Sequence, residues 1–277
     1  MKIKNVIKKV SALGFAVILL LGVTACGSDK KTDDGDGRSI TVAVAPGFFP
    51  ITYADDNGNA AGYDVEVFKA IDEMLPEYKF IFEVVDKETM NVGVQTGTYQ
   101  VGINSMFKTE ERLETYIMPE NNMGYTAVGC LYREGEEHIK SFEDIYNRQL
   151  RIHPNTPSGS IQNVIDAWTA DHPDTPLEMG IVATLDNNEG MDSVRAGEYD
   201  VFFQLIPVIN LWSEESKTGL ALSDPLAVVP TFPIINKEET ELNDKINAAL
   251  AELQANGTLS RLSVDAFGYD VFELKND

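Results

Sequence analysis

Few side chains in this 277-residue sequence are arranged for catalysis or metal binding. The three histidines, His138, His153 and His172, are scattered, and no two have the spacing of metal ligands on one helix. No Ser-His-Asp, Cys-His or GxxxxGK phosphate-loop pattern can be placed. Asp64 and Glu111 could act as acid-base groups, but both are better explained as charges at helix termini. We therefore predict no catalysis, no metal site and no cofactor.

Cys26 is the residue whose position points most directly to a chemical modification. The chain begins with four lysines and no acid, and an uncharged apolar stretch follows over 10–25. This is the layout of a secretory signal, and the stretch is shorter than the roughly twenty residues that span a membrane. Residues 23–27 (VTACG) resemble a bacterial lipobox, in which the cysteine is diacylated and becomes the first mature residue. An ordinary signal peptide followed by a chance cysteine is the alternative.

The region around Cys26 therefore predicts how the chain is held at the membrane. Residues 1–25 form the predicted lipoprotein signal peptide, and residues 26–38 form a flexible tether, because 27–38 contain no apolar side chain to bury. Acyl chains such as palmitate on Cys26 anchor the protein stably without a spanning helix. The predicted location is extracytoplasmic, on the cell membrane.

The charge of the chain excludes some partners. Asp and Glu number 44 against 22 Lys and Arg, and the formal net charge is -22. Binding to phosphates needs clustered basic side chains, so nucleic acid and anionic lipid surfaces are not expected partners. The remaining cysteine, Cys130, has no disulfide partner in the chain if Cys26 is acylated.

Apolar runs alternate with segments of helical periodicity in two successive groups, which predicts an α/β protein. The first group consists of strands at 40–45, 80–85 and 101–104, with helices near 65–75, 90–96 and after Thr109. The second consists of strands at 150–153, 177–182 and 200–206, with helices after Ser141 and near 161–168 and 188–196. A strand at 231–236 and a helix near 242–253 complete the chain. Two lobes are implied, and ligands are favoured between them.

Three blocks of sequence occur in the order and spacing of a known family. The first is 48–53 (FFPITY) with 62–66 (GYDVE), the second is 95–100 (QTGTYQ) with 108–112 (KTEER), and the third is 250–259 (LAELQANGTL) with 267–268 (FG). Over residues 39–269 the chain resembles the bacterial extracellular solute-binding proteins of family 3, the polar amino-acid branch. The region 172–176 (HPDTP) is similar to the cystine-binding subgroup.

The resemblance implies a two-lobed fold of the type II periplasmic-binding-protein class. Each lobe would be a mixed sheet flanked by helices, and two crossing strands would join the lobes. Lobe 1 would contain 39–127 and 232–277, and lobe 2 would contain 128–231. Cys130, near the first crossing, would be a small buried hydrophobic residue. The implied partners of this monomer are a small carboxylated molecule, such as an amino acid, and the permease of an ABC transporter.

The resemblance assigns Arg112 to the arginine that binds the carboxylate of the ligand. A guanidinium group matches a carboxylate with two charge-assisted hydrogen bonds and stays charged when it is buried. Without the resemblance, an arginine after Thr-Glu-Glu is more often a surface ion-pair partner. Asn104, Ser105 and Phe107 precede Arg112 in the strand-to-helix loop that offers further ligand contacts, and Asn104 replaces a small hydroxyl residue there.

Other family positions contribute from both lobes. Phe48 matches the aromatic residue that stacks on the ligand side chain, although a core phenylalanine is the alternative. Thr156, Ser158 and Gly159 match a loop at a helix start, whose free N–H groups suit a carboxylate. A plain turn with Ser158 as the helix N-cap is the alternative.

The clearest departure from the family is Leu205. Relatives have an Asp here that pairs with the α-amino group of the ligand, and leucine cannot do this. Either Gln204, Asn104 or another acid takes over, or the ligand is not a standard α-amino acid. Ala45 stands where relatives that bind cationic side chains can carry an acid, so lysine, arginine and histidine are disfavoured as ligands.

These observations predict a substrate-binding lipoprotein of an ABC importer. Its ligand would be a small carboxylated solute, of the class of polar or sulfur-containing amino acids such as cystine. A sensory or signalling lipoprotein that binds the same kind of ligand is the main alternative. A cleft enzyme of the same fold is a further one, although it would need a positioned acid-base group.

Overall fold

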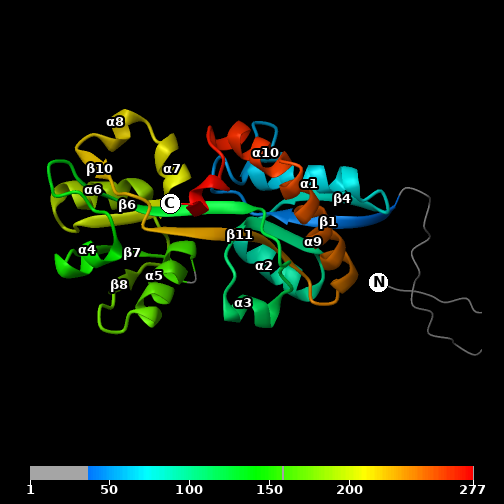
Figure 1. The fold of residues 1–277 in the computed structure, drawn as a ribbon, viewed down its shortest axis with the longest axis horizontal. Helices are drawn as coiled ribbons and strands as arrows, with labels where there is room; N and C mark the ends of the chain where they lie inside the picture. Colours follow the sequence, from blue (N-terminus) through cyan, green and yellow to red (C-terminus); the bar gives the residue numbers. More distant parts are fainter. Residues whose placement is uncertain (1–36, 158, 277) are drawn as a thin grey trace, which may run out of the picture. The chain divides into compact units, whose positions relative to one another are not determined.

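The computed structural model describes residues 37–157 and 159–276 (Figure 1). The predicted signal peptide, Cys26 and Ser158 lie outside the described residues. Most of the predicted tether also lies outside them.

The first group of elements is built around a parallel sheet whose central strand is covered on both faces. β1 (Arg38–Val44) lies between β4 (Tyr78–Val84) and β5 (Val101–Met106) and pairs in parallel with both. Continuous apolar strands such as β1 are typical of this position. The helices of this group are α1 (Tyr63–Met74), α2 (Lys87–Thr96), α3 (Glu110–Thr115), α9 (Thr240–Ala255) and α10 (Thr258–Phe267).

The core of this group lies between the sheet and the apolar faces of its helices. Val65, Phe68 and Ile71 of α1 are fully buried, and they share one core cluster with Ile246 and Leu250 of α9. The helix faces that the sequence predicts for these segments are thus confirmed. In Figure 1, α1, α9 and α10 are drawn beside β1 and β4.

The second group also has a mixed sheet. β9 (Val201–Leu205) pairs antiparallel with β6 (Gly124–Arg133) and parallel with β7 (Ile152–Asn155), which pairs in parallel with β8 (Met179–Ile181). β10 (Leu220–Leu222) pairs with β6. The helices of this group are α4 (Phe142–Asn147), α5 (Ser160–Asp171), α6 (Asn187–Ala196), α7 (Ile206–Leu211) and α8 (Glu214–Lys217).

Two long antiparallel strands join the groups. β11 (Ala227–Ile235) pairs with β6 through Ala227–Thr231, and its later residues pair with β5. The strand order is therefore β4-β1-β5-β11-β6-β9-β7-β8. Figure 1 shows β6 and β11 side by side in the centre of the view, between the two groups. The smaller elements are the hairpin of β2 (Tyr53–Ala54) and β3 (Ala60–Ala61) and a 3-10 turn, η1 (Glu273–Asn276).

The structure differs from the sequence predictions at two strands. The predicted strand at 200–206 ends at Leu205, because α7 begins at Ile206 with Pro207 in its first turn, where the missing N–H of proline costs nothing. The predicted strand at 231–236 begins four residues earlier, at Ala227. Residues 227–230 (AVVP) are apolar but only partly buried, and the proline at 230 argues against a strand when the sequence is considered alone.

Candidate functional site

The end of β5 and the loop that follows it are held in an unusual conformation next to the end of β1. Asn104 is buried, and its Nδ2 donates to the carbonyl oxygen of Ala45 over 2.7 Å, so the ends of β5 and β1 are tied together. The next residue, Ser105, has a φ of 49°, a left-handed conformation that is uncommon for residues other than glycine. Such conformations persist where the surroundings enforce them, often at ligand-binding sites.

Asp64 holds Ser105 in this conformation, a role that differs from the one predicted from the sequence. Its side chain is completely buried in the first turn of α1, and its Oδ2 accepts the backbone N–H of Ser105 over 2.9 Å. Burial raises the pKa of Asp64 to about 7, and the Ser105 hydrogen bond opposes that rise. Asp64 thus lies in the first turn of a helix, as the helix-terminal interpretation predicts, but its side chain is buried. The signal for this burial in the sequence is that Asp64 stands between two apolar residues, Tyr63 and Val65.

Arg112 lies at the other end of this loop and is nine-tenths buried. α3 begins after Thr109, whose hydroxyl caps the helix by accepting from the Arg112 N–H. The Arg112 Nη1 donates to the carbonyl oxygen of Phe107 over 2.7 Å, which fixes the guanidinium group against the loop. Burial lowers the pKa of Arg112, but an arginine stays protonated at neutral pH. An exposed surface role for Arg112 is thereby excluded.

Lys87 adds a second positive charge to the surroundings of Arg112. It is the first residue of α2, and its pKa is lowered by desolvation and then by the charge of Arg112. The residue as a whole keeps exposed surface, so its ammonium group remains in reach of solvent or a ligand. Sequence reasoning missed Lys87, because it is far from Arg112 in the sequence and no local pattern links the two residues. Two neighbouring cations favour the binding of an anion between or beside them.

Phe48, Phe107 and Leu205 belong to one apolar environment. Phe107 and Leu205 are members of the same buried cluster, and Phe48 packs against that cluster while keeping part of its surface exposed. Leu205 is 1% exposed. Position 205, where the resemblance to the family predicts an acid, is therefore part of an apolar core in this chain.

Gln204 is not positioned as a simple substitute for that acid. Its Nε2 donates to the Oδ1 of Asn187 over 3.1 Å, and its Oε1 accepts the backbone N–H of Leu205 over 2.8 Å. Both ends of the amide thus have partners within the protein. Asn104 uses its Nδ2 for Ala45, and its Oδ1 is the end of the amide that can accept from an ammonium group.

The predicted loop of the second group lies at the start of α5. Gly159 is the N-cap of this helix and makes no side-chain cap hydrogen bond, whereas Ser158 lies outside the described residues. A Cβ on Gly159 would lie 2.9 Å from the Oγ1 of Thr156, which explains the need for glycine. Asn155, which sequence reasoning missed as a site residue, is buried, and its Nδ2 has no hydrogen-bond partner in the described structure.

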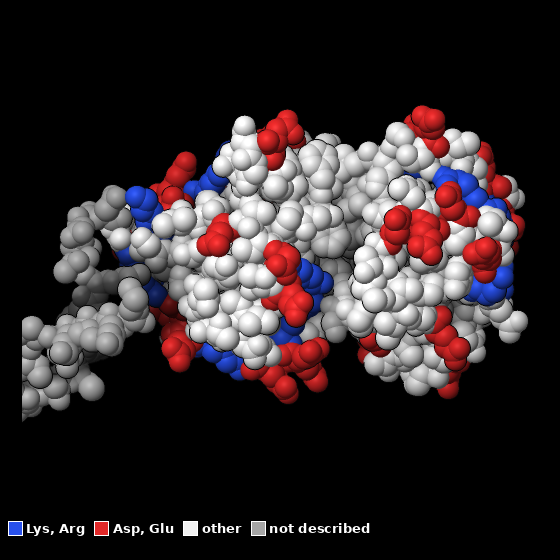
Figure 2. Space-filling model, turned by 180° about the vertical axis from the view of Figure 1, so that it is seen from behind, with Lys and Arg blue, Asp and Glu red and all other residues white. Residues whose placement is uncertain are grey.

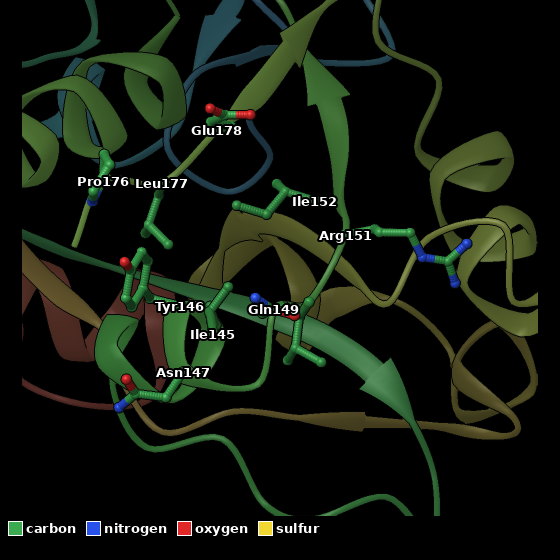
Figure 3. Close-up of a pocket in the computed structure, with 10 residues that line it drawn as sticks. Ile145, Tyr146, Asn147, Gln149, Arg151, Ile152, Pro176, Leu177 and Glu178 are labelled. Carbon is green, nitrogen blue, oxygen red and sulfur yellow. The ribbon is translucent and has the colours of Figure 1, made fainter.

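A hollow of about 520 Å³ is lined by a different set of residues (Figure 3). It is lined by α4, the start of β7 and the segment before β8, and the close-up shows Tyr146, Leu177 and Ile152 around it. None of the predicted ligand-binding residues lines it. Size alone does not mark it as the binding site, because it lacks the convergent cations found near Arg112.

Further features of the described residues also bear on function. Acidic side chains are spread over the face shown in Figure 2, with basic ones between them, and do not form a single patch. Among the described residues, no group of three or more His, Cys, Asp or Glu could hold a metal ion. In the same part of the chain, no helix is both long enough and apolar enough to cross a membrane.

Cys130 is completely buried, as predicted, and burial raises the pKa of its thiol to about 12.

The fold and the site together define a class of protein. Two mixed sheets flanked by helices and joined by β6 and β11 form the type II periplasmic-binding fold, which solute-binding proteins use. The chain belongs to the bacterial extracellular solute-binding proteins, family 3, whose model matches residues 40–269. Members of this family are substrate-binding proteins rather than enzymes.

Individual relatives and solved structures agree with this assignment. The L-cystine-binding protein TcyK of Bacillus subtilis (strain 168) is 27% identical over 265 residues, which cover 94% of this chain and 95% of the relative. The probable amino-acid ABC transporter extracellular-binding protein ytmK from Bacillus subtilis has a TM-score of 0.70 at 23% identity, covering 84% of this chain and 98% of that one. A Streptococcus mutans structure, titled for glutathione import via GshT and the cystine ABC importer TcyBC, has a TM-score of 0.69 at 20% identity, covering 85% and 97%. At these identities the two structures support the fold alone.

Proposed function

We propose that this protein is the lipid-anchored substrate-binding component of an ABC importer and binds a small carboxylated solute. The solute belongs to the class of polar or sulfur-containing amino acids such as cystine. The anchor is a diacylated Cys26, and the partner is the permease of the importer. The names of relatives such as TcyK support both the importer and the type of solute.

The observation that carries the proposal is the buried Arg112 with Lys87 beside it. The guanidinium group is fixed by Phe107 at the end of the loop after β5, and the charge of Arg112 lowers the pKa of Lys87. A carboxylate reduces the repulsion between these cations and forms charge-assisted hydrogen bonds with Arg112. The start of α5, with Asn155 and the N–H groups after Gly159, is a second place for an anionic group.

Leu205 determines what we propose for the α-amino group of the solute. With Leu205 in the apolar cluster and both ends of Gln204 already bonded, no acid of the relatives' kind is available at this position. We infer that the α-amino group contributes less to binding than the carboxylate does. Phe48, which keeps part of its surface exposed, supplies apolar surface for the remainder of the solute, which suits a disulfide-containing side chain.

Calorimetric titration with two matched compounds tests the proposal. L-cystine and 3,3′-dithiodipropionate have the same disulfide and the same two carboxylates, and the second compound lacks both amino groups. We expect both compounds to bind, with affinities within about tenfold of each other, a difference of about 1.4 kcal/mol. Diethyl disulfide, which keeps the disulfide and lacks both carboxylates, is the control and should not bind. If neither carboxylated compound binds, cystine-like solutes are excluded, and if L-cystine alone binds, an unidentified acid must pair with its amino groups.

A further inference from the structure

Three buried side-chain oxygen atoms around Ser105 have no hydrogen-bond partner in the described part of the structure. They are the Oδ1 of Asp64, the Oγ of Ser105 and the Oγ1 of Thr126, and each of these residues is at most 2% exposed. All three residues line one small cavity. A buried polar atom without a partner costs about 1 to 3 kcal/mol, so three in one place indicate a ligand that satisfies them together.

The size of the cavity limits what that ligand can be. Its volume is about 10 Å³, close to the smallest volume that holds one water molecule. Much of the rest of its lining consists of bulky side chains, including Tyr63, Pro207 and Phe267. The ammonium group of an amino acid with its attached carbon does not fit this space, so the cavity is separate from the proposed solute site.

The donors and acceptors around the cavity match one water molecule. Water can donate one hydrogen to the Oδ1 of Asp64 and the other to a hydroxyl oxygen of Ser105 or Thr126. The second hydroxyl then donates to the water oxygen, so that all three groups are satisfied. Buried waters in proteins make about three hydrogen bonds of this kind. A cation such as Na⁺ is less suited, because the site offers one carboxylate and little room for further oxygen ligands.

We propose that Asp64, Ser105 and Thr126 form a binding site for a single internal water molecule. The three residues come from α1, β5 and the crossing strand β6, so the water joins the loop between Asn104 and Arg112 to β6. It completes the support that Asp64 gives to the left-handed Ser105 through its backbone N–H. The water site does not depend on the proposed solute, whereas its effect on solute affinity rests on the proposed function.

Thr126→Val tests the site, because valine keeps the shape of threonine and removes the hydroxyl group. Thr231→Val is the matched control: Thr231 lines the same cavity on the neighbouring strand, but its hydroxyl donates to the carbonyl oxygen of Gly124 over 3.3 Å. We expect a high-resolution crystal structure of the wild type to show one water within hydrogen-bond distance of all three oxygens. Water-17O relaxation dispersion should count one long-lived water fewer in Thr126→Val than in Thr231→Val.

Two results would overturn the site. One is a wild-type density map that resolves other internal waters and shows nothing between the three oxygens. The other is an anomalous peak at this position in crystals soaked in a thallium(I) salt, which would identify a cation site. Ser105→Gly, which removes the second hydroxyl and accepts the left-handed backbone, should also lose the water and provides a second variant if Thr126→Val does not fold.

The role of the water in binding is tested separately with L-cystine as the probe. We expect Thr126→Val to bind L-cystine about three- to tenfold more weakly than Thr231→Val, because the loop of Arg112 loses one attachment. Equal affinities in the two variants would overturn this role while leaving the water site intact. A wild-type protein that contains the water but does not bind L-cystine would instead count against the proposed solute.

Discussion

Burial acts in opposite directions on the two ionisable residues that hold the loop after β5. It raises the pKa of Asp64 to about 7 and lowers the pKa of Arg112, because a low-dielectric interior disfavours the charged form of each. For Arg112 the shift leaves the charge in place, ready for a carboxylate. For Asp64 the shift means that the carboxyl group gains or loses its proton near neutral pH.

Replacing Arg112 tests the carboxylate contact directly. Arg112→Ala should weaken L-cystine binding by at least about 2 kcal/mol, roughly 30-fold, because a buried charge-assisted pair is lost. Arg112→Lys should have an intermediate effect, since an ammonium group cannot form the two parallel hydrogen bonds. Calorimetry measures both, and Arg261→Ala, at an exposed arginine of α10, controls for the change in net charge. Retained affinity in Arg112→Ala would remove Arg112 from the site.

Asp64→Asn tests the pH dependence that follows from the raised pKa. The native state holds the Asp64 proton more tightly than the unfolded state, so the contribution of Asp64 to stability is full below about pH 4 and is lost as the pH rises to about 7. The groups that face Asp64 are the hydroxyls of Ser105 and Thr126 and the phenols of Tyr63 and Tyr125, all uncharged at neutral pH.

Asparagine mimics the neutral acid, so this variant should gain stability relative to the wild type as the pH rises. We expect the difference in unfolding free energy to grow by up to about 1.4 kcal/mol per pH unit between pH 4.5 and 7. Urea unfolding at several pH values measures it. Parallel pH profiles of the two proteins would contradict a shifted Asp64.

Leu205→Asp restores the acid that relatives have and should change solute preference. The ratio of L-cystine to 3,3′-dithiodipropionate affinity should rise at least about tenfold, because the new carboxylate pairs with an ammonium group. The ligand-free protein should lose stability, since the acid replaces a member of the apolar cluster. Leu205→Asn has the same size without the charge and controls for packing. An equal ratio in both variants would show that position 205 does not face the amine.

At the scale of elements, side chains outside the site hold the strands in register. Asp200, just before β9, accepts the backbone N–H and the Nε of Arg151, each over 2.9 Å, and also pairs with Arg133 of β6. The hydrogen bonds from Arg151 hold the pKa of the Asp200 carboxyl well below its usual range. The segment before β7, the start of β9 and β6 are thus joined at one residue.

The start of α1 depends on glycine, which positions Asp64 and with it the small cavity of the proposed water site. Gly62 has a φ of 114°, and a Cβ there would lie 2.4 Å from the carbonyl oxygen of Ile51. Gly62→Ala should cost about 3 kcal/mol or more in unfolding free energy, from strain and overlap together. Gly58→Ala is the control, because Gly58 also has a positive φ, of 82°, and no atom lies within 4 Å of the added Cβ; it should cost about 1 kcal/mol. Denaturant unfolding compares them, and equal losses would show that the contact with Ile51 is unimportant.

At the scale of the whole molecule, β6 and β11 are the strands that connect the two groups of elements. Ile51 and Phe107, from the first group, are buried in the same cluster as Leu205 and Val208 of the second. The proposed solute site and the proposed water site therefore lie at the junction that any relative movement of the groups would change.

Membrane attachment is a property of the whole molecule that rests on one side chain. Cys26→Ala should shift the protein from the membrane fraction to the soluble extracytoplasmic fraction of the producing cells, because the acyl chains that would hold it are lost. Cell fractionation with immunodetection measures this shift, and Cys130→Ala is the control, because Cys130 is buried in the fold. A Cys26→Ala protein that remains with the membrane would contradict lipid anchoring.

The order of the elements and much of their extent could be predicted from local sequence patterns. The apolar face of α1 and the Thr109 cap of α3 are signals within one or two turns of chain, and the structure contains both. α7 was missed because 206–211 continue the apolar character of β9, so no local pattern marks the change from strand to helix.

By itself, the sequence determined the class of the chain, the periodicity of its elements, and the family motifs that single out Arg112 and Leu205. Tertiary structure alone decided which side chains are buried together. Asp64, Ser105 and Thr126 are far apart in the sequence, and each has an ordinary polar side chain when considered alone. Packing of α1, β5 and β6 around one cavity removes these groups from bulk water, which raises the pKa of Asp64, and the hydrogen bond from the Ser105 N–H to Asp64 supports the left-handed backbone of Ser105.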